Sequence, residues 1–381
     1  MSFFQNLATK YPTWQELSTY LSSEEGGAFR IRECGRFAIL QYKKGITKIT
    51  DETAELRSVV WDTVRHAPVC VAPAKARAGS PPCGVPLRVQ EFLDGVMINA
   101  FKVLGDPKVH IVSRSQFDAA GTFYSKKSFG ELFKEALPTA TLEDLFSSVE
   151  PTEATPAYFA SFVLQHPEHR VVYRPPKPAI YCVDFAAVTA EKTIERKIAI
   201  PGILLQCMIP HLNEGLVFQT EEEMMELVKT ESLKRGWTWQ GLVFFDAAGN
   251  RWRLRNPTYT YLRGLRGNDS APEARFLRLR SQGKISEYLK HYADERDLFW
   301  SFEEKLRAQT QAVYDGYCAV HKSHEKTLAD IPHPLKTLVF RLHSHYIDVL
   351  RPQKIPIQKK DAIDLANSLP LWEQQLLLKA A

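Results

Sequence analysis

The sequence predicts an α+β domain followed by an all-α domain. Up to about residue 267, short runs rich in β-branched and aromatic residues recur between a few helical segments. From residue 268 onward these runs disappear, and apolar residues recur at spacings of three and four. A chain of 381 residues is long enough for two ordinary domains. We therefore expect one domain over residues 1–267 and a second over residues 268–381.

Three helices are expected in the first domain. The first covers residues 13–23, where Thr13 is the N-cap and Glu16 completes a capping box. The second covers residues 128–138 and ends at its proline, and the third covers residues 221–236 and ends at its glycine.

The remaining regular segments of this domain read as strands. Residues 76–86 form a loop by their Gly, Pro and Ser content, and residues 240–256 are typical of a hairpin with a Gly-Asn turn. The other expected strands lie within residues 28–42, 57–62, 68–74, 89–92, 95–103, 109–115, 161–167, 169–175, 179–188 and 192–200.

In the second domain the spacing of apolar residues predicts helices throughout. They are expected within residues 274–293, 295–321, 334–350 and 360–369.

Composition excludes several classes of protein. The formal charge of +5 is mild for this length, so only local clustering can argue for a polyanionic partner. The six cysteines are scattered without a CxxC pair, which argues against zinc binding and thiol redox chemistry. No stretch resembles a signal peptide or a membrane span, so we expect no membrane partner and a cytoplasmic or nuclear protein.

Four stretches of the first domain contain residues suited to chemistry. The stretch RVQEFLDGVMINAF contains Asp94 and Gly95, which on their own could be a hairpin turn, and Arg114 follows in VSRSQ. The other three are SFVLQHPEHRVV at 161–172, WQGLVFFD at 239–246 and RWRLRNPTYTYLRGLRGN at 251–268.

The order and spacing of these stretches resemble the covalent nucleotidyltransferase superfamily. They are most similar to bacteriophage-type RNA ligases and related ligase-like proteins of large DNA viruses. The resemblance covers roughly residues 30–270 and includes RSVVWD followed by VCVAPAK, similar to the strand pair that precedes the nucleophile motif in that superfamily. It implies a ligase-like domain of antiparallel sheets with an adenylate-binding cleft, ATP and Mg²⁺ as cofactors, and an RNA end as substrate.

The chain departs from this pattern at the residues that carry the chemistry. Phe92 stands where the family has its nucleophilic lysine, and Gln165 and Gln240 stand where it has glutamates. Arg253 and Arg255 replace two lysines, and arginine still binds phosphate. A phenylalanine cannot attack a phosphate, and a glutamine is a poor ligand for a hard cation.

We therefore expect a degenerate, non-adenylylating member that binds nucleotide and RNA. Its nucleotide-binding residues are expected to be Phe92, Asp94, Gly95, Arg114, Gln165, Gln240, Arg253 and Arg255. We assign no residue as a metal ligand. The alternative is an active ATP-dependent RNA ligase with a displaced lysine, Lys75 or Lys102, although both can equally be surface lysines. A capping-type guanylyltransferase is a further alternative that also needs the absent lysine.

An arginine-rich segment is the strongest local signal for RNA. No acidic residue lies between Arg251 and Arg266. Alternation places Arg251, Arg253 and Arg255 on one face of a strand, where an anion would relieve their repulsion. We expect RNA to contact Arg251, Tyr259, Tyr261, Arg263 and Arg266, with both tyrosines exposed on a loop. The other interpretation is an arm of the core with solvated arginines.

Overall fold

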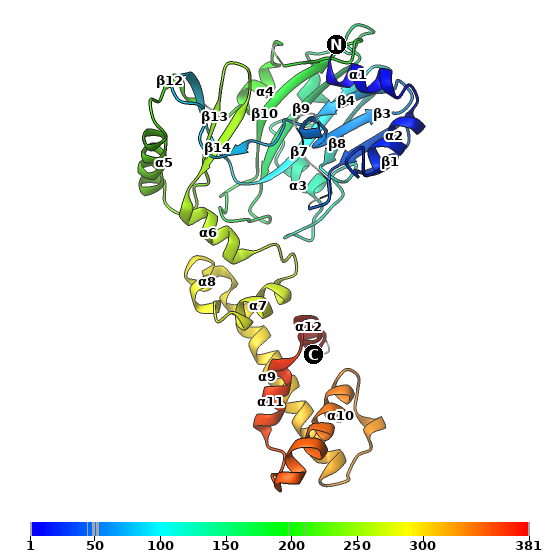
Figure 1. Cartoon of the computed structure of the whole chain (residues 1–381), viewed down its shortest axis with the longest axis vertical. Helices are drawn as coiled ribbons and strands as arrows, with labels where there is room; N and C mark the ends of the chain where they lie inside the picture. The colour runs from blue at the N-terminus through cyan, green and yellow to red at the C-terminus, as the bar shows by residue number, and fades with distance from the viewer. Residues whose placement is uncertain are drawn as a thin grey trace. The chain divides into compact units, whose positions relative to one another are not determined.

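A computed structural model describes residues 2–43, 45–47, 50, 53–196, 198–209 and 211–379. The chain forms two compact units, Met1–Tyr261 and Leu262–Ala381, and the boundary that we expected lay slightly later, after residue 267. Strands are found in the first unit, and the described part of the second unit is helical (Figure 1). The expected mixture of helices and antiparallel sheets is therefore confirmed.

The first sheet contains four antiparallel strands in sequence order. They are β1 (Arg30–Cys34), β2 (Phe37–Gln41), β3 (Ser58–Asp62) and β4 (Ala67–Val71). Two helices, α1 (Phe3–Lys10) and α2 (Trp14–Ser22), contribute buried side chains to the same core, with Trp61 fully buried. The capping box of Thr13 and Glu16 is present, as expected from the sequence, whereas α1 was not expected.

The second sheet contains five antiparallel strands in the order β11-β10-β9-β7-β8. They are β7 (Val96–Val103), β8 (Asp106–Ser113), β9 (Ala157–Gln165), β10 (Ala179–Val188) and β11 (Ile194–Glu195). Apolar side chains of α3 (Phe129–Glu135) and α4 (Gly202–Gln206) complete its core. Lys197, within an expected strand, lies outside the described residues.

The third sheet has the order β12-β6-β13-β14-β5, and all its pairs are antiparallel except the short one between β14 and β5. Its strands are β5 (Arg77–Ala78), β6 (Pro86–Glu91), β12 (His211–Val217), β13 (Gly241–Phe245) and β14 (Arg251–Arg255). Helix α5 (Glu221–Arg235) packs on one face and ends at Gly236, which has a φ of 76°. Glycine adopts this left-handed conformation without strain.

The described part of the second unit contains six α-helices, the end of α6 (Pro257–Arg266) and several short 3-10 or π-helical segments. They are α7 (Pro272–Ser281), α8 (Ile285–His291), α9 (Arg296–His321), α10 (Leu335–His345), α11 (Lys359–Ser368) and α12 (Leu371–Lys379). Tyr288 stacks on Tyr292 and on Phe299, with ring centroids 4.3 and 5.4 Å apart. No helix among the described residues has the length and apolarity needed to cross a membrane.

Two segments differ from the expectation. Residues 169–175, expected as a strand, have no regular structure. Residues 255–259 (RNPTY) were expected as a loop, but α6 begins at Pro257, because Asn256 accepts a hydrogen bond from the Thr258 amide at 2.9 Å and Pro257 occupies the first helical position. An Asn-Pro pair is therefore a helix start here rather than a turn, since both residues are favoured in those positions.

Candidate functional site

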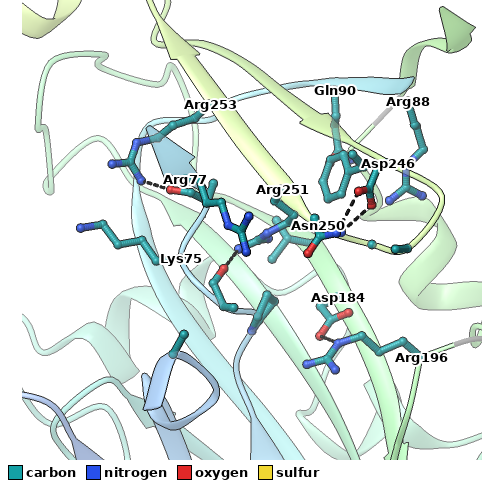
Figure 2. Close-up of a pocket in the computed structure, with 18 of the residues that line it drawn as sticks. Lys75, Arg77, Arg88, Gln90, Asp184, Arg196, Asp246, Asn250, Arg251 and Arg253 are labelled. Carbon is teal, nitrogen blue, oxygen red and sulfur yellow. Dashed lines mark hydrogen bonds and ion pairs between the residues drawn. The ribbon is translucent and has the colours of Figure 1, made fainter. Parts of the chain in front are cut away.

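A large cavity of about 1690 Å³ lies between the second and third sheets (Figure 2). Side chains from β6 and β14 line one side of it, and side chains from β10 line the other. The segment that leads into β5 also contributes. Its charged lining residues are Arg57, Lys75, Arg77, Arg88, Arg196, Arg251, Arg253, Glu55, Asp184, Glu214 and Asp246. Among the described residues, seven basic side chains thus face four acidic ones.

Strand β14 presents its arginines to this side because of its alternation. Trp252 and Leu254 are buried, and Leu254 packs in the core beneath α5. The odd-numbered residues Arg251, Arg253 and Arg255 therefore share the opposite face, as the sequence predicted. Arg251 donates to the carbonyl of Ala74 and Arg253 to that of Ala76 (Figure 2), so both arginines also hold the segment before β5.

Burial and mutual repulsion act on the cations of the cavity. The pKa of Arg251 is lowered to about 10, mainly by burial; Asp184 opposes this shift, and Arg57 and Arg196 add to it by repulsion. Burial also lowers the pKa of Arg57, to which Arg114 and Arg253 contribute by repulsion. Cations that are desolvated together in this way would be stabilised by a bound anion.

Two of the basic side chains, Lys75 and Arg88, form no ion pair with the described residues. Lys75 makes no hydrogen bond or ion pair with the residues that the structure describes, and no dashed line reaches its amine in Figure 2. Arg88 packs its guanidinium 4.4 Å from the ring centroid of Phe245 and has no ion pair within the described chain. By contrast, Arg196 is paired with Asp184 at 3.0 Å.

A smaller cavity of about 440 Å³ adjoins the expected nucleophile position. Phe92, Gln165 and Gln240 all line it, so the structure brings these three together as predicted. Three more aromatic side chains line it, Tyr173, Tyr181 and Trp239, together with the charged residues Glu91, Asp94 and Arg235.

The other predicted nucleotide-binding residues are distributed around the two cavities. Arg253 lines the larger one, and the Arg255 guanidinium lies 5.3 Å from the ring centroid of Phe92. Arg114 lines neither, but its guanidinium lies 5.6 Å from the ring of Tyr42, which lines the larger cavity. The predicted nucleotide-binding residues were expected to line one cleft, and the structure distributes them around two cavities.

Asp94 and Gly95 have a clear structural role. The Asp94 carboxylate accepts from the backbone amides of Val172 and Tyr173, each at 3.0 Å, and from the Tyr259 hydroxyl at 2.7 Å. A Cβ on Gly95 would lie 2.4 Å from the carbonyl oxygen of Leu164. Asp94-Gly95 is therefore more than a turn, because it ties three distant parts of the chain together.

The two candidate lysines differ. Lys102 donates to Glu150 at 2.6 Å and to the carbonyl of Val149, and it lines neither cavity. Lys75 lines the larger cavity. Only Lys75 therefore has a position beside the clustered arginines.

The expected exposure of the RNA-binding set is wrong for Tyr259. It is fully buried, because helical periodicity in α6 places it on the same inward side as Leu262 and Arg266. Arg266 is 4% exposed and is paired with Glu295 at 3.0 Å. Tyr261, which is 48% exposed, and Arg263 remain on the outside.

Four basic residues of the larger cavity were not found from the sequence: Arg57, Arg77, Arg88 and Arg196. Each is a single arginine in a different segment, so no local pattern identifies it. Arg57 begins RSVVWD, one of the stretches that carried the family resemblance, and this was the one available signal.

One group of potential metal ligands was found in the described part of the chain. Glu135, His166 and Glu168 have ligand atoms within 4.8 Å of one another. The Lys127 ammonium lies 2.9 Å from Glu135 and 2.7 Å from Glu168, and so supplies the positive charge that this group needs. His166 donates from Nε2 to the Glu135 carboxylate at 3.1 Å, and its Nδ1 accepts from the Glu168 amide. The arrangement is a satisfied ion-pair network.

No family model matches the chain, and no curated protein matches it. Solved structures with a similar arrangement include a putative ATP-dependent DNA ligase from Aquifex aeolicus, at 14% identity and a TM-score of 0.43 over 96% of this chain and 88% of that one. Two forms of an archaeal ATP-dependent RNA ligase have 11% and 10% identity and TM-scores of 0.43 and 0.44. They cover 79% and 77% of this chain and 74% and 76% of theirs. At such low sequence identities and TM-scores, the similarity to these structures assigns no function to this chain.

Proposed function

We propose that the protein binds the phosphate groups of a nucleotide or an RNA end in the larger cavity, as a ligase-like protein that does not adenylylate itself. The observation that carries this proposal is the surplus of basic side chains around one cavity, seven against four acidic ones among the described lining residues. Basic side chains gathered with partly lowered pKa values are stabilised when a polyanion binds. Arginine and lysine are also the residues that recognise phosphate best.

The non-covalent form of the proposal rests on the residues at the smaller cavity. Phe92 has no nucleophilic atom, and the guanidinium of Arg255 covers its ring. Gln165 and Gln240 are neutral where a metal-dependent site would need carboxylates. ATP, with or without Mg²⁺, is thus proposed as a ligand rather than as a consumed cofactor. Tyr261 and Arg263, both exposed on α6, remain proposed contacts for RNA.

A second candidate function is an active nucleotidyltransferase that uses Lys75. Its support is that the Lys75 amine lines the basic cavity and has no hydrogen bond or ion pair within the described residues. In that reaction the neutral amine would attack the α-phosphorus of ATP or GTP, forming a P–N bond while the bond to the β-phosphate oxygen breaks, pyrophosphate leaves and the nitrogen releases one proton to solvent. The surrounding arginines would stabilise the departing charge.

The binding proposal is tested with Lys75→Met and Arg88→Met, which remove charge without removing a described ion pair. Each variant should weaken binding of a 5′-phosphorylated single-stranded RNA in a filter-binding assay. The slope of log affinity against log salt should flatten by about 0.7 for each lost phosphate contact. The matched control is Lys229→Met, which removes one exposed lysine of α5 outside the cavity. If the wild-type chain and all three variants bind the RNA with the same affinity and the same salt dependence, this cavity does not bind phosphate.

The two candidate functions are separated by incubation with labelled ATP or GTP and Mg²⁺, followed by a denaturing gel. We expect no label on the wild-type chain. An acid-labile label that Lys75→Arg abolishes would establish the second candidate instead. Labelling that survives in Lys75→Arg but not in Lys102→Arg would assign the nucleophile to Lys102.

A further inference from the structure

Residues 207–209 lie between the two cavities of the first unit. Met208 lines the larger cavity, and the next residue, Ile209, lines the smaller one. On β10, Tyr181 lines the smaller cavity and Val183 lines the larger one, and both lie on the face opposite the buried Cys182. The two cavities therefore adjoin along this face of β10 and form one cleft.

The dividing segment is attached to both walls of the cleft. The buried side-chain amide of Gln90, on β6 of the third sheet, donates to the carbonyl of Ile209 at 3.0 Å. The backbone amide of Cys182, on β10 of the second sheet, donates to the carbonyl of Cys207 at 2.8 Å. A continuous set of contacts therefore runs from one sheet to the other through residues 207–209.

The two sides of this segment differ in chemistry. The larger cavity is rich in arginine and lysine, whereas the described lining of the smaller one includes four aromatic rings and two glutamine amides. The one basic residue of this described lining, Arg235, is paired with Glu91 at 3.2 Å. Basic side chains suit phosphate, and aromatic and amide side chains suit a flat ring with polar edges. A nucleotide with its ring in the smaller cavity and its phosphates in the larger one would have to displace residues 207–209.

We propose that residues 207–209 form a partition that selects the ligand of the cleft, with the hydrogen bond from Gln90 to Ile209 holding it closed. The inference rests on the proposed function, since it assumes that phosphate binds in the larger cavity. The closed partition favours ligands that offer phosphate alone, such as a polyphosphate or the phosphorylated end of an RNA. A free nucleotide that spans both cavities binds more weakly, because part of its binding free energy is needed to displace residues 207–209.

The partition can be followed without any ligand, because Cys207 lies in it and is buried. In Gln90→Met, iodoacetamide should alkylate Cys207 faster than in the wild-type chain, by a factor of about three to ten, which corresponds to one hydrogen bond. Peptide mapping should show no change at Cys70, which is buried in a different core cluster. Unaltered alkylation of Cys207 in Gln90→Met would overturn the partition.

A matched control distinguishes the partition from general loosening of the cleft. Gln165→Met also removes a buried amide, one that donates to the carbonyl of Asp94 at 2.7 Å, but it leaves residues 207–209 untouched. Cys207 should react at the wild-type rate in this variant. Equal acceleration by both substitutions would contradict the proposal.

Ligand selection is tested on the wild-type chain by competition between tripolyphosphate and ATP. Tripolyphosphate should bind more tightly, and Gln90→Met should shift the ratio of the two affinities towards ATP. Tighter binding of ATP by the wild-type chain would refute selection by the partition. If neither compound binds, the proposed phosphate site fails, and the alkylation of Cys207 still decides whether the partition opens as described.

Discussion

At the scale of single residues, Asp94 shows how a motif residue can have a structural role. Its buried carboxylate accepts three hydrogen bonds, two from the backbone of residues 172–173 and one from Tyr259. The segment after β9 has no regular structure, so these bonds satisfy amides that a sheet would otherwise satisfy. The sequence pattern identified the residue, and the structure adds a role in holding the irregular segment.

Asp94→Ala should therefore lower the free energy of unfolding by about 3 kcal/mol, because it leaves two backbone amides and a hydroxyl without their acceptor. Tyr259→Phe removes only one of the three bonds and should cost about 1–2 kcal/mol. Urea denaturation of both variants measures this difference. Equal stability of Asp94→Ala and the wild-type chain would show that the three bonds contribute nothing net.

At the scale of elements, β7 begins with a close approach to β9. The position before Val96 is Gly95, whose missing side chain allows the backbone of Leu164 to lie alongside. An added Cβ would also lie 2.7 Å from a methyl group of Val163. Backbone atoms cannot move aside without disturbing the pairing of the two strands.

We expect Gly95→Ala to destabilise the first unit by about 3 kcal/mol, the cost of a forced overlap in a packed region. Gly202→Ala is the control, since nothing lies within 4 Å of its added Cβ at the start of α4. That variant should be as stable as the wild-type chain or slightly more so. The idea of a required close approach would be abandoned if both substitutions had the same small effect on thermal unfolding.

At the scale of the whole molecule, a pair of histidines gives the helical unit a means of responding to pH. In the helical unit, the rings of His321 on α9 and His343 on α10 are parallel with centroids 3.7 Å apart. Tyr317 and Tyr346 also face the pair. Burial lowers the pKa of His321, and the neighbouring His343 and His324 lower it further.

Because the pKa of His321 is lower in the folded chain than its unfolded value of about 6.5, protonation favours the unfolded state. The stabilising contribution is complete above pH 6.5 and is lost as the pH falls below that value. Calorimetry should show the unfolding temperature of the protein moving down by a few degrees between pH 7.5 and 5.0. His343→Phe should reduce this shift, since one repulsive partner is gone. If the unfolding temperature of His343→Phe changes with pH as much as that of the wild-type chain, groups other than this histidine pair cause the sensitivity to acid.

The sequence by itself determined the mixed class of the fold, the helical character of the second unit and the shared face of Arg251, Arg253 and Arg255. These features follow from local periodicity, which is set by the geometry of strands and helices. It also identified Phe92, Gln165 and Gln240 as neighbours, through the order of the motifs, and the cavity that they share agrees.

Only the tertiary structure decided which charges act together. Arg57, Arg88 and Arg196 come from distant segments and meet at one cavity because two sheets face each other across it. The same packing buried Tyr259 and supplied Glu295 to Arg266, although no acidic residue is near Arg266 on its N-terminal side in the sequence. It also placed Met208 at the larger cavity and Ile209, the next residue, at the smaller one. Burial and charge pairing depend on contacts between remote parts of the chain, which local sequence patterns do not encode.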